Sequence, residues 1–172
     1  HKPETSDSGW QTISSGRPWE ELGHESLDGG GWYGGVLHLD ESWYGRPVYL
    51  AIWSVDDFYQ LYVNGVPVRE YREKEWRKRQ PTVTRIDPWL RAEGPDLIAI
   101  RVLDTGDTGG LTGPVAVSNE KRDLSWEPLR LPLGEGWRFR PDSEGRGLAE
   151  GWHAEAYDDT GWSTCPVTGD GW

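Results

Sequence analysis

The residues best suited to bind a ligand are aromatic and polar side chains on expected strands between residues 48 and 103. In the segment 48–53, Val48, Leu50 and Ile52 alternate with other side chains, which predicts a half-buried strand with one apolar face. The residues opposite the apolar pattern of their strands are Tyr49, Trp53, Gln60, Tyr62 and Arg101. If that face is exposed and concave, rings can stack on a pyranose while amide and guanidinium groups bind its hydroxyls. If a second layer covers it, for instance the C-terminal tail, the aromatic residues belong to the interior.

A second group of candidates lies in expected loops, where binding residues concentrate because a scaffold fixes the loop ends. The group consists of Trp43, Tyr44, Asp56, Asp57, Trp76, Arg77, Asp104 and Asp107. Trp76 stands among charged residues, so it suits binding, although it could equally close the end of a sandwich. The acidic turn 104–107, with Asp104 and Asp107, and the pair Asp158 and Asp159 could hold a structural calcium ion through oxygen ligands. No other cofactor is expected.

Motifs of common catalytic sites are absent from the sequence. It has no GxSxG, no HExxH, no P-loop and no Cys-His pairing of a nucleophilic kind. The carboxylates lie mostly in expected turns, as solvated residues do, although a facing pair cannot be recognised from sequence. We therefore expect a non-catalytic chain. A small glycosidase or esterase is kept as an alternative to the two non-catalytic functions considered below.

Short strands must position these residues. Residues 97–103 alternate as 48–53 do, and Asn64-Gly65 is the two-residue turn that favours a hairpin within 58–68. Further short strands are expected at 82–86, 114–117, 129–133 and 137–140. No window of useful length has helical periodicity, although 70–79 could form a solvated helical turn. Regularly spaced short strands predict an all-β sandwich or barrel.

Composition limits the partners. A chain of 172 residues suits one domain over residues 1–172, and its net charge of −11 disfavours nucleic acid and acidic membranes. Neutral glycans are easier partners than polyanionic ones. The single cysteine, Cys165, cannot form a disulfide within the chain, and we find neither an 18-residue apolar stretch nor a leader. Since the sequence starts at His1 and lacks Met, we expect a mature or excised piece of a larger protein, with an extracellular or periplasmic location favoured.

An internal repeat spans almost the whole chain. The segment Asp7-Ser8-Gly9-Trp10-Gln11-Thr12 returns as Asp159-Thr160-Gly161-Trp162-Ser163-Thr164, and Trp19 returns as Trp172. A period that spans almost the whole chain corresponds to one domain. Residues 134–172 therefore resemble the opening of a second repeat.

Several motifs together carry a resemblance to a known family. They are Gly31-Trp32-Tyr33, Leu39-Asp40-Glu41-Ser42-Trp43, Val55-Asp56-Asp57, Tyr62-Val63-Asn64-Gly65 and Ile98-Ala99-Ile100-Arg101-Val102. In order and spacing they resemble the sugar-binding jelly-roll domain of family 2 glycoside hydrolases, a galactose-binding-like fold. The segments 76–79 and 104–113 also resemble accessory domains of sialate O-acetylesterases. The resemblance covers roughly residues 7–118.

The family's opening strand, of the type Trp-x-Phe, is missing at the N-terminus, and its likeness lies at 136–139, followed by Tyr157-Asp158-Asp159. Either the tail completes its own sandwich, or the chain was cut across a tandem pair. In the second case the tail could complete a neighbour and form a domain-swapped oligomer.

The resemblance implies a jelly-roll β-sandwich that acts as a carbohydrate-binding module or accessory domain of a glycan-active enzyme. Its partners would be an oligo- or polysaccharide and a parent catalytic domain. The alternative is a structural or assembly domain that packs against that partner. The 12 tryptophans bear on the choice, because a binder should expose some of them. The tryptophans expected in the core or its rim are Trp32, Trp89, Trp137 and Trp162.

Overall fold

The regular elements of the chain are strands joined by turns. The structure, a computed structural model, describes residues 16–25, 27–71, 81–119 and 137–165. Its strands are β1 (Gly29–Leu37), β2 (Tyr49–Ile52), β3 (Phe58–Val63), β4 (Val66–Tyr71), β5 (Thr82–Arg85), β6 (Asp96–Asp104), β7 (Val115–Ser118), β8 (Trp137–Asp142) and β9 (Ser163–Cys165). Short 3-10 helices occur at η1 (Trp19–Leu22), η2 (Glu41–Trp43) and η4 (Asp87–Trp89).

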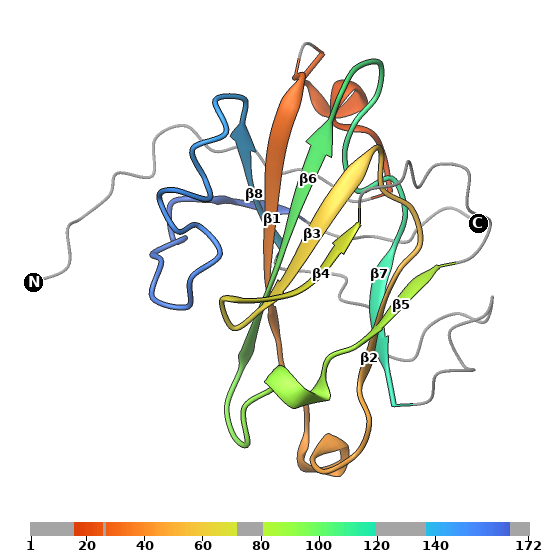
Figure 1. Cartoon of the computed structure of the whole chain (residues 1–172), viewed down its shortest axis with the longest axis vertical. Coiled ribbons are helices and arrows are strands. Elements are labelled where there is room, and N and C mark those ends of the chain that lie inside the picture. Colours follow the sequence, from red (N-terminus) through yellow and green to blue (C-terminus); the bar gives the residue numbers. More distant parts are fainter. Residues whose placement is uncertain (1–15, 26, 72–80, 120–136, 166–172) are drawn as a thin grey trace, which may run out of the picture.

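The strands form two antiparallel sheets that pack face to face (Figure 1). The larger sheet has the order β4-β3-β6-β1-β8-β9, and the smaller one has the order β5-β2-β7. The all-β jelly-roll sandwich expected from the sequence is confirmed. In the described part of the chain, no helix is long and apolar enough to cross a membrane.

The main core lies between the two sheets and follows the alternation of the strands. It includes Leu50 and Ile52 of β2 and Ile98, Ile100 and Val102 of β6, all at most 2% exposed. Each such side chain stabilises the fold by about 1.5–3 kcal/mol relative to leaving it in water. The expected strands at 82–86, 114–117 and 137–140 are present as β5, β7 and β8, whereas 129–133 lies outside the described residues.

The hairpin between β3 and β4 turns at Asn64-Gly65, as expected. Both residues have positive φ, 50° and 80°, as a two-residue hairpin turn requires. Asn64 Nδ2 donates to the Trp89 carbonyl at 2.8 Å and to Asp96 Oδ1 at 2.7 Å, and Asn64 Oδ1 accepts from Leu97 N–H at 2.9 Å. The asparagine therefore fastens the hairpin to the start of β6.

A second apolar cluster lies on the outer face of the six-stranded sheet. It is covered by residues 143–162, the connection from β8 to β9, which we call the cover segment. The cluster consists of Trp32, Tyr62, Ala99, Trp152 and Trp162, all at most 6% exposed. Figure 1 shows the cover segment in blue beside β8 and β1. The outer face of this sheet is thus covered over part of its length.

The described part of the segment 134–172 joins the sheet of its own chain. Strand β8 pairs with β1 from Gly30↔Asp142 to Gly34↔Arg138, and β9 pairs with β8. Residues 134–136 and 166–172 lie outside the described residues. The single domain over 1–172, the second repeat and the domain-swapped oligomer remain predictions.

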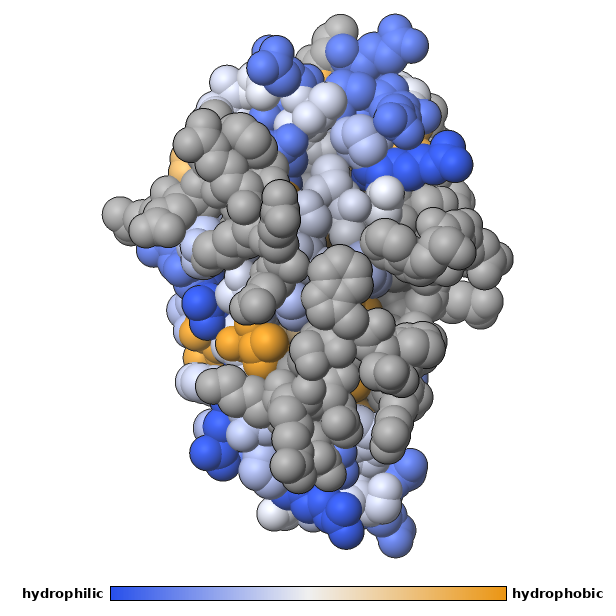
Figure 2. Space-filling view, turned by 90° about the vertical axis from the view of Figure 1, so that its right-hand side faces the viewer, coloured by the Kyte–Doolittle hydropathy of each residue, from blue (hydrophilic) through white to orange (hydrophobic). Residues whose placement is uncertain are grey.

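One side of the sandwich has strongly hydrophilic ends. The side that lies to the right in Figure 1 faces the viewer in Figure 2. There, hydrophilic side chains gather at both ends of the described part, and a few apolar ones are visible, the largest patch below the middle.

Candidate functional site

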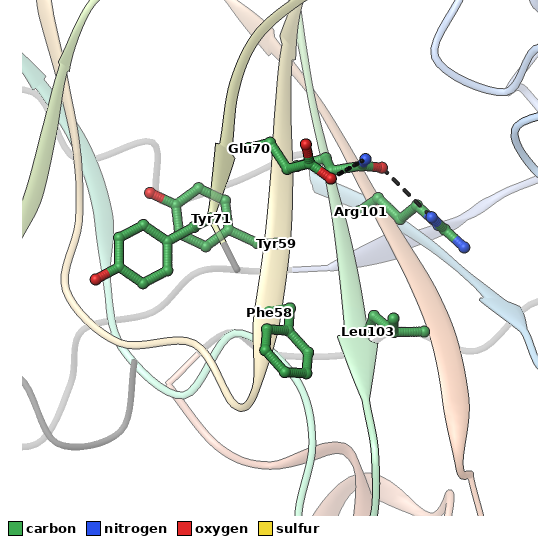
Figure 3. Close-up of a pocket in the computed structure, with 7 residues that line it drawn as sticks. Phe58, Tyr59, Glu70, Tyr71, Arg101 and Leu103 are labelled. Carbon is green, nitrogen blue, oxygen red and sulfur yellow. Dashed lines mark hydrogen bonds between the residues drawn. The ribbon is translucent and has the colours of Figure 1, made fainter. Parts of the chain in front are cut away.

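An open hollow of about 320 Å³ lies on the outer side of the six-stranded sheet, where β4, β3 and β6 run side by side (Figure 3). Its lining residues are Phe58, Tyr59, Gln60, Glu70, Tyr71, Arg101 and Leu103. Two of the sequence candidates, Gln60 and Arg101, are therefore brought together. No residue of the cover segment lines the hollow.

Strand register explains why these side chains converge. Gln60 is paired with Glu70 on β4 and with Arg101 on β6, so the three form one row across the sheet. Phe58 is paired with Leu103 in the neighbouring row. Because side chains two residues apart share a face, a polar row lies beside an apolar row.

Hydrogen bonds fix the polar row. Gln60 Nε2 donates to Glu70 Oε1 at 3.2 Å, while Gln60 Oε1 accepts from Arg101 Nη1 at 3.3 Å (Figure 3). Gln60 Oε1 also accepts from the Tyr62 hydroxyl at 3.1 Å. The amide is therefore oriented with its oxygen towards two donors and its nitrogen towards a carboxylate. Arg101 Nε is buried and has no hydrogen-bond partner among the described residues.

The apolar row offers a surface for a sugar ring. Phe58 is half-buried and Leu103 is 37% exposed. Tyr59 and Tyr71 belong to the core side of their strands, where their rings stack with centroids 5.7 Å apart and planes 6° apart. An apolar ring face could rest on Phe58 and Leu103 while its hydroxyls reach the polar row.

The other strand candidates lie elsewhere. Tyr62 shares the outer face with Gln60 but is only 4% exposed, because the cover segment lies over it. Tyr49 and Trp53 belong to β2 and its end, so they lie on the outer side of the three-stranded sheet. The five residues expected on one face are thus divided between opposite faces of the sandwich.

The loop candidates Trp43 and Tyr44 line a second hollow of about 300 Å³, away from the first. It is formed with residues of the loops around η2 and η4, among them Arg46, Asp87 and Arg91. Asp87 is engaged by Arg85 through two hydrogen bonds of 2.8 and 2.9 Å. Trp76 and Arg77 lie outside the described residues. The structure therefore does not join the loop candidates into one site with Gln60 and Arg101.

Two of the residues proposed as calcium ligands, Asp104 and Asp107, lie at the end of β6 and in the turn after it. Asp104 is 3% exposed, and Asp107 lies in the exposed loop with a φ of 72°. Within the described ranges, no three His, Cys, Asp or Glu side chains come together in a way that could hold a metal ion. A calcium ion held by Asp104 and Asp107 remains a prediction.

Burial governs the ionisation of Asp104. Burial raises the pKa of this carboxyl, the Gly106 N–H lowers it, and the carboxylates of Asp57, Glu20 and Asp56 raise it further. Asp104 Oδ1 accepts from Gly106 N–H at 3.0 Å, whereas Oδ2 is buried without a hydrogen-bond partner among the described residues. A negative charge here is costly to the folded state.

This predicts a pH-dependent effect of Asp104→Asn. Because the folded-state pKa is raised, the native protein holds this proton more tightly, and stability falls as the pH rises from the ordinary carboxyl pKa through the raised one. We expect the variant to melt a few degrees higher than the parent at pH 7, with the gain vanishing in acid. Thermal unfolding between pH 3 and pH 8 measures this. A bound calcium ion would reverse the result, because the variant and a chelator would then both lower the melting temperature.

Sequence reasoning missed five residues of the first hollow: Phe58, Tyr59, Glu70, Tyr71 and Leu103. Period-two alternation from Gln60 identifies Phe58, and the same step from Arg101 identifies Leu103, so a signal for both was present. Glu70 and Tyr71 follow only from the register of the hairpin, which pairs Gln60 with Glu70.

In its fold the chain is a jelly-roll β-sandwich domain similar to domains within large glycoside hydrolases. The structure of Streptomyces avermitilis α-L-rhamnosidase complexed with L-rhamnose matches 81% of this chain and 12% of that chain, at 18% identity and a TM-score of 0.56. A glycosyl hydrolase family 2 member from Bacteroides cellulosilyticus matches 64% and 17%, at 19% identity and a TM-score of 0.51. Bacteroides uniformis β-glucuronidase matches 66% and 15%, at 24% identity and a TM-score of 0.53.

The comparisons concern the fold of one domain. This chain spans less than a fifth of each of these three enzymes. No family model matches the sequence, and no curated protein matches it.

Proposed function

We propose that the chain is a non-catalytic, carbohydrate-binding accessory domain of a larger glycan-active enzyme. The observation that carries the proposal is the hollow in which an apolar row, Phe58 and Leu103, lies beside the hydrogen-bonded row Glu70, Gln60 and Arg101. A sugar likewise has an apolar ring face beside polar hydroxyl groups, so it can contact both rows. The fold likeness to domains that form only a small part of glycoside hydrolases also supports an accessory role.

Charge favours a neutral glycan as the ligand. The chain has a net charge of −11, so a polyanionic sugar is repelled at long range. Within the hollow, the guanidinium of Arg101 and the carboxylate of Glu70 flank one amide, which provides both donors and acceptors for hydroxyl groups. Since the contacts are few, the expected affinity is in the weak range of small ligands.

A structural domain that packs against a catalytic partner is the second candidate. It is favoured by the burial of the tryptophans. Trp19, Trp32, Trp152 and Trp162 are at most 6% exposed, and the other tryptophans whose side chains are described are half-buried. Among the described residues, the stacking platform would therefore be Phe58 rather than an exposed indole.

Calorimetric titration with neutral and acidic oligosaccharides tests the proposal. We expect saturable binding of one neutral class by the parent protein and at least fivefold weaker binding by Arg101→Met, which keeps the aliphatic stem but loses the guanidinium. Val36→Ala is the control, because Val36 is 52% exposed on the same sheet and lies outside the hollow. No binding across the panel would favour the packing domain.

A further inference from the structure

Tyr62 connects the hollow to the cover segment. Its ring is 4% exposed and lies against Trp32, with centroids 5.5 Å apart, and against His153 of the cover segment, with centroids 4.7 Å apart. Its hydroxyl reaches out of this cluster and donates to Gln60 Oε1 at 3.1 Å. One side chain therefore has its ring in a buried layer and its polar atom at the wall of the hollow.

We infer that Tyr62 is a positioning residue, which holds the Gln60 amide in the orientation that the hollow presents to a ligand. The effect of Tyr62 on ligand binding rests on the proposed function. Its effect on the orientation of the Gln60 amide rests only on contacts within the chain. Tyr62 is too buried to touch a sugar, so it acts through Gln60.

The hydrogen bonds of Gln60 explain why the tyrosine matters. Gln60 Oε1 accepts from Tyr62 at 3.1 Å and from Arg101 at 3.3 Å, so Tyr62 supplies the shorter of the two bonds. The terminal torsion of a glutamine side chain is broad, and an amide with one donor fewer can rotate. Rotation would turn the Nε2–H donor away from Glu70 and change the pattern of donors and acceptors in the polar row.

Two features keep the Tyr62 hydroxyl in place. Burial raises its pKa, with a further increase from Glu70 that Arg101 opposes, so the hydroxyl remains a donor at neutral pH. The cover segment also holds the ring. It is tied to the loop before β6 by the ion pair of Arg91 Nη2 and Glu155 Oε1 at 2.5 Å, and its backbone at 153–155 lies close against Gly65.

The matched pair Tyr62→Phe and Tyr157→Phe tests the inference. Tyr62→Phe removes one oxygen and keeps the ring in the cluster. Tyr157→Phe removes a hydroxyl that accepts from Arg140 Nη1 at 3.1 Å in the same cluster and is not hydrogen-bonded to Gln60. Both variants should therefore fold.

The first measurement is the side-chain amide signal of Gln60 by NMR in the ligand-free protein. We expect Tyr62→Phe to shift the Gln60 Nε2–H₂ pair and Tyr157→Phe to leave it unchanged. Unchanged Gln60 signals in Tyr62→Phe would overturn the inference, whether or not any sugar binds.

The second measurement is affinity for the neutral oligosaccharide found by titration. We expect binding to weaken about three- to tenfold in Tyr62→Phe and to stay at the parental value in Tyr157→Phe. Equal weakening in both variants would point to general loosening of the cluster and would overturn the inference. If the parent protein binds no sugar while the Gln60 signals shift as expected, the proposed function fails and the positioning of Gln60 stands.

Discussion

Replacing Trp32 by alanine should lower the free energy of unfolding by about 3–5 kcal/mol, the largest effect on stability that we expect from one substitution. Trp32 is fully buried on β1, between the sheet and the cover segment. Its ring lies against Tyr62, Trp152 and His153, with the His153 centroid 6.0 Å away and the planes 19° apart. Alanine would leave a cavity, because the surrounding structure collapses only partly around a deleted side chain.

The indole N–H adds a second part to this effect. Trp32 Nε1 donates to Asp142 Oδ2 at 3.1 Å, and the same oxygen accepts from Gly147 N–H at 3.1 Å. Trp32→Phe is the matched control, since it keeps a ring but removes the donor from a buried carboxylate. We expect it to cost about 1–3 kcal/mol. Urea denaturation followed by circular dichroism measures the free energy of unfolding of both variants. A loss below about 1 kcal/mol for Trp32→Ala would contradict the packing of the cover segment onto the sheet.

Replacing Phe58 by alanine should weaken carbohydrate binding at least tenfold, the largest effect on binding that we expect. Phe58 is the one aromatic side chain in the apolar row of the hollow, and tenfold corresponds to about 1.4 kcal/mol. Its removal would take away the flat surface under a sugar ring but leave Gln60 and Arg101 in place. Calorimetric titration of both proteins with the same neutral oligosaccharide provides the comparison.

Phe58→Tyr is the control for the binding experiment, because it keeps the ring and should retain affinity within about threefold. Leu103→Ala, in the same row, should have a smaller effect than Phe58→Ala, since an aliphatic side chain offers less flat area. If Phe58→Ala bound the sugar as tightly as the parent, the site would lie elsewhere. Thermal unfolding of each variant separates lost binding from lost fold.

The fold could be predicted because its signals are local. Alternation in 48–53 and 97–103 assigns core faces within single strands, and Asn64-Gly65 has a conformation that favours one hairpin turn. Both features appear in the structure as expected. Each depends only on residues close in sequence, so alternation and the turn dipeptide reveal them without knowledge of the rest of the chain.

The site could be predicted only in part, because alternation does not say which sheet a strand joins. Gln60 and Tyr49 are both opposite the core pattern of their strands, yet β3 belongs to the larger sheet and β2 to the smaller one. Tyr62 shows a second limit. Its burial depends on Trp152 and His153, which come from a segment far along the chain, and no pattern within β3 reports that contact.

A titration followed by two-dimensional NMR of the isotopically labelled protein tests the central claim, carbohydrate binding in the hollow, most directly. With a neutral oligosaccharide, we predict saturable shifts of the backbone amides of Phe58, Gln60, Arg101 and Leu103, together with the Gln60 side-chain amide and Arg101 Nε–H. Signals near Trp43 and Tyr44 should stay in place. Shifts confined to those two residues and their loop, or no shifts with any sugar of the panel, would contradict the account.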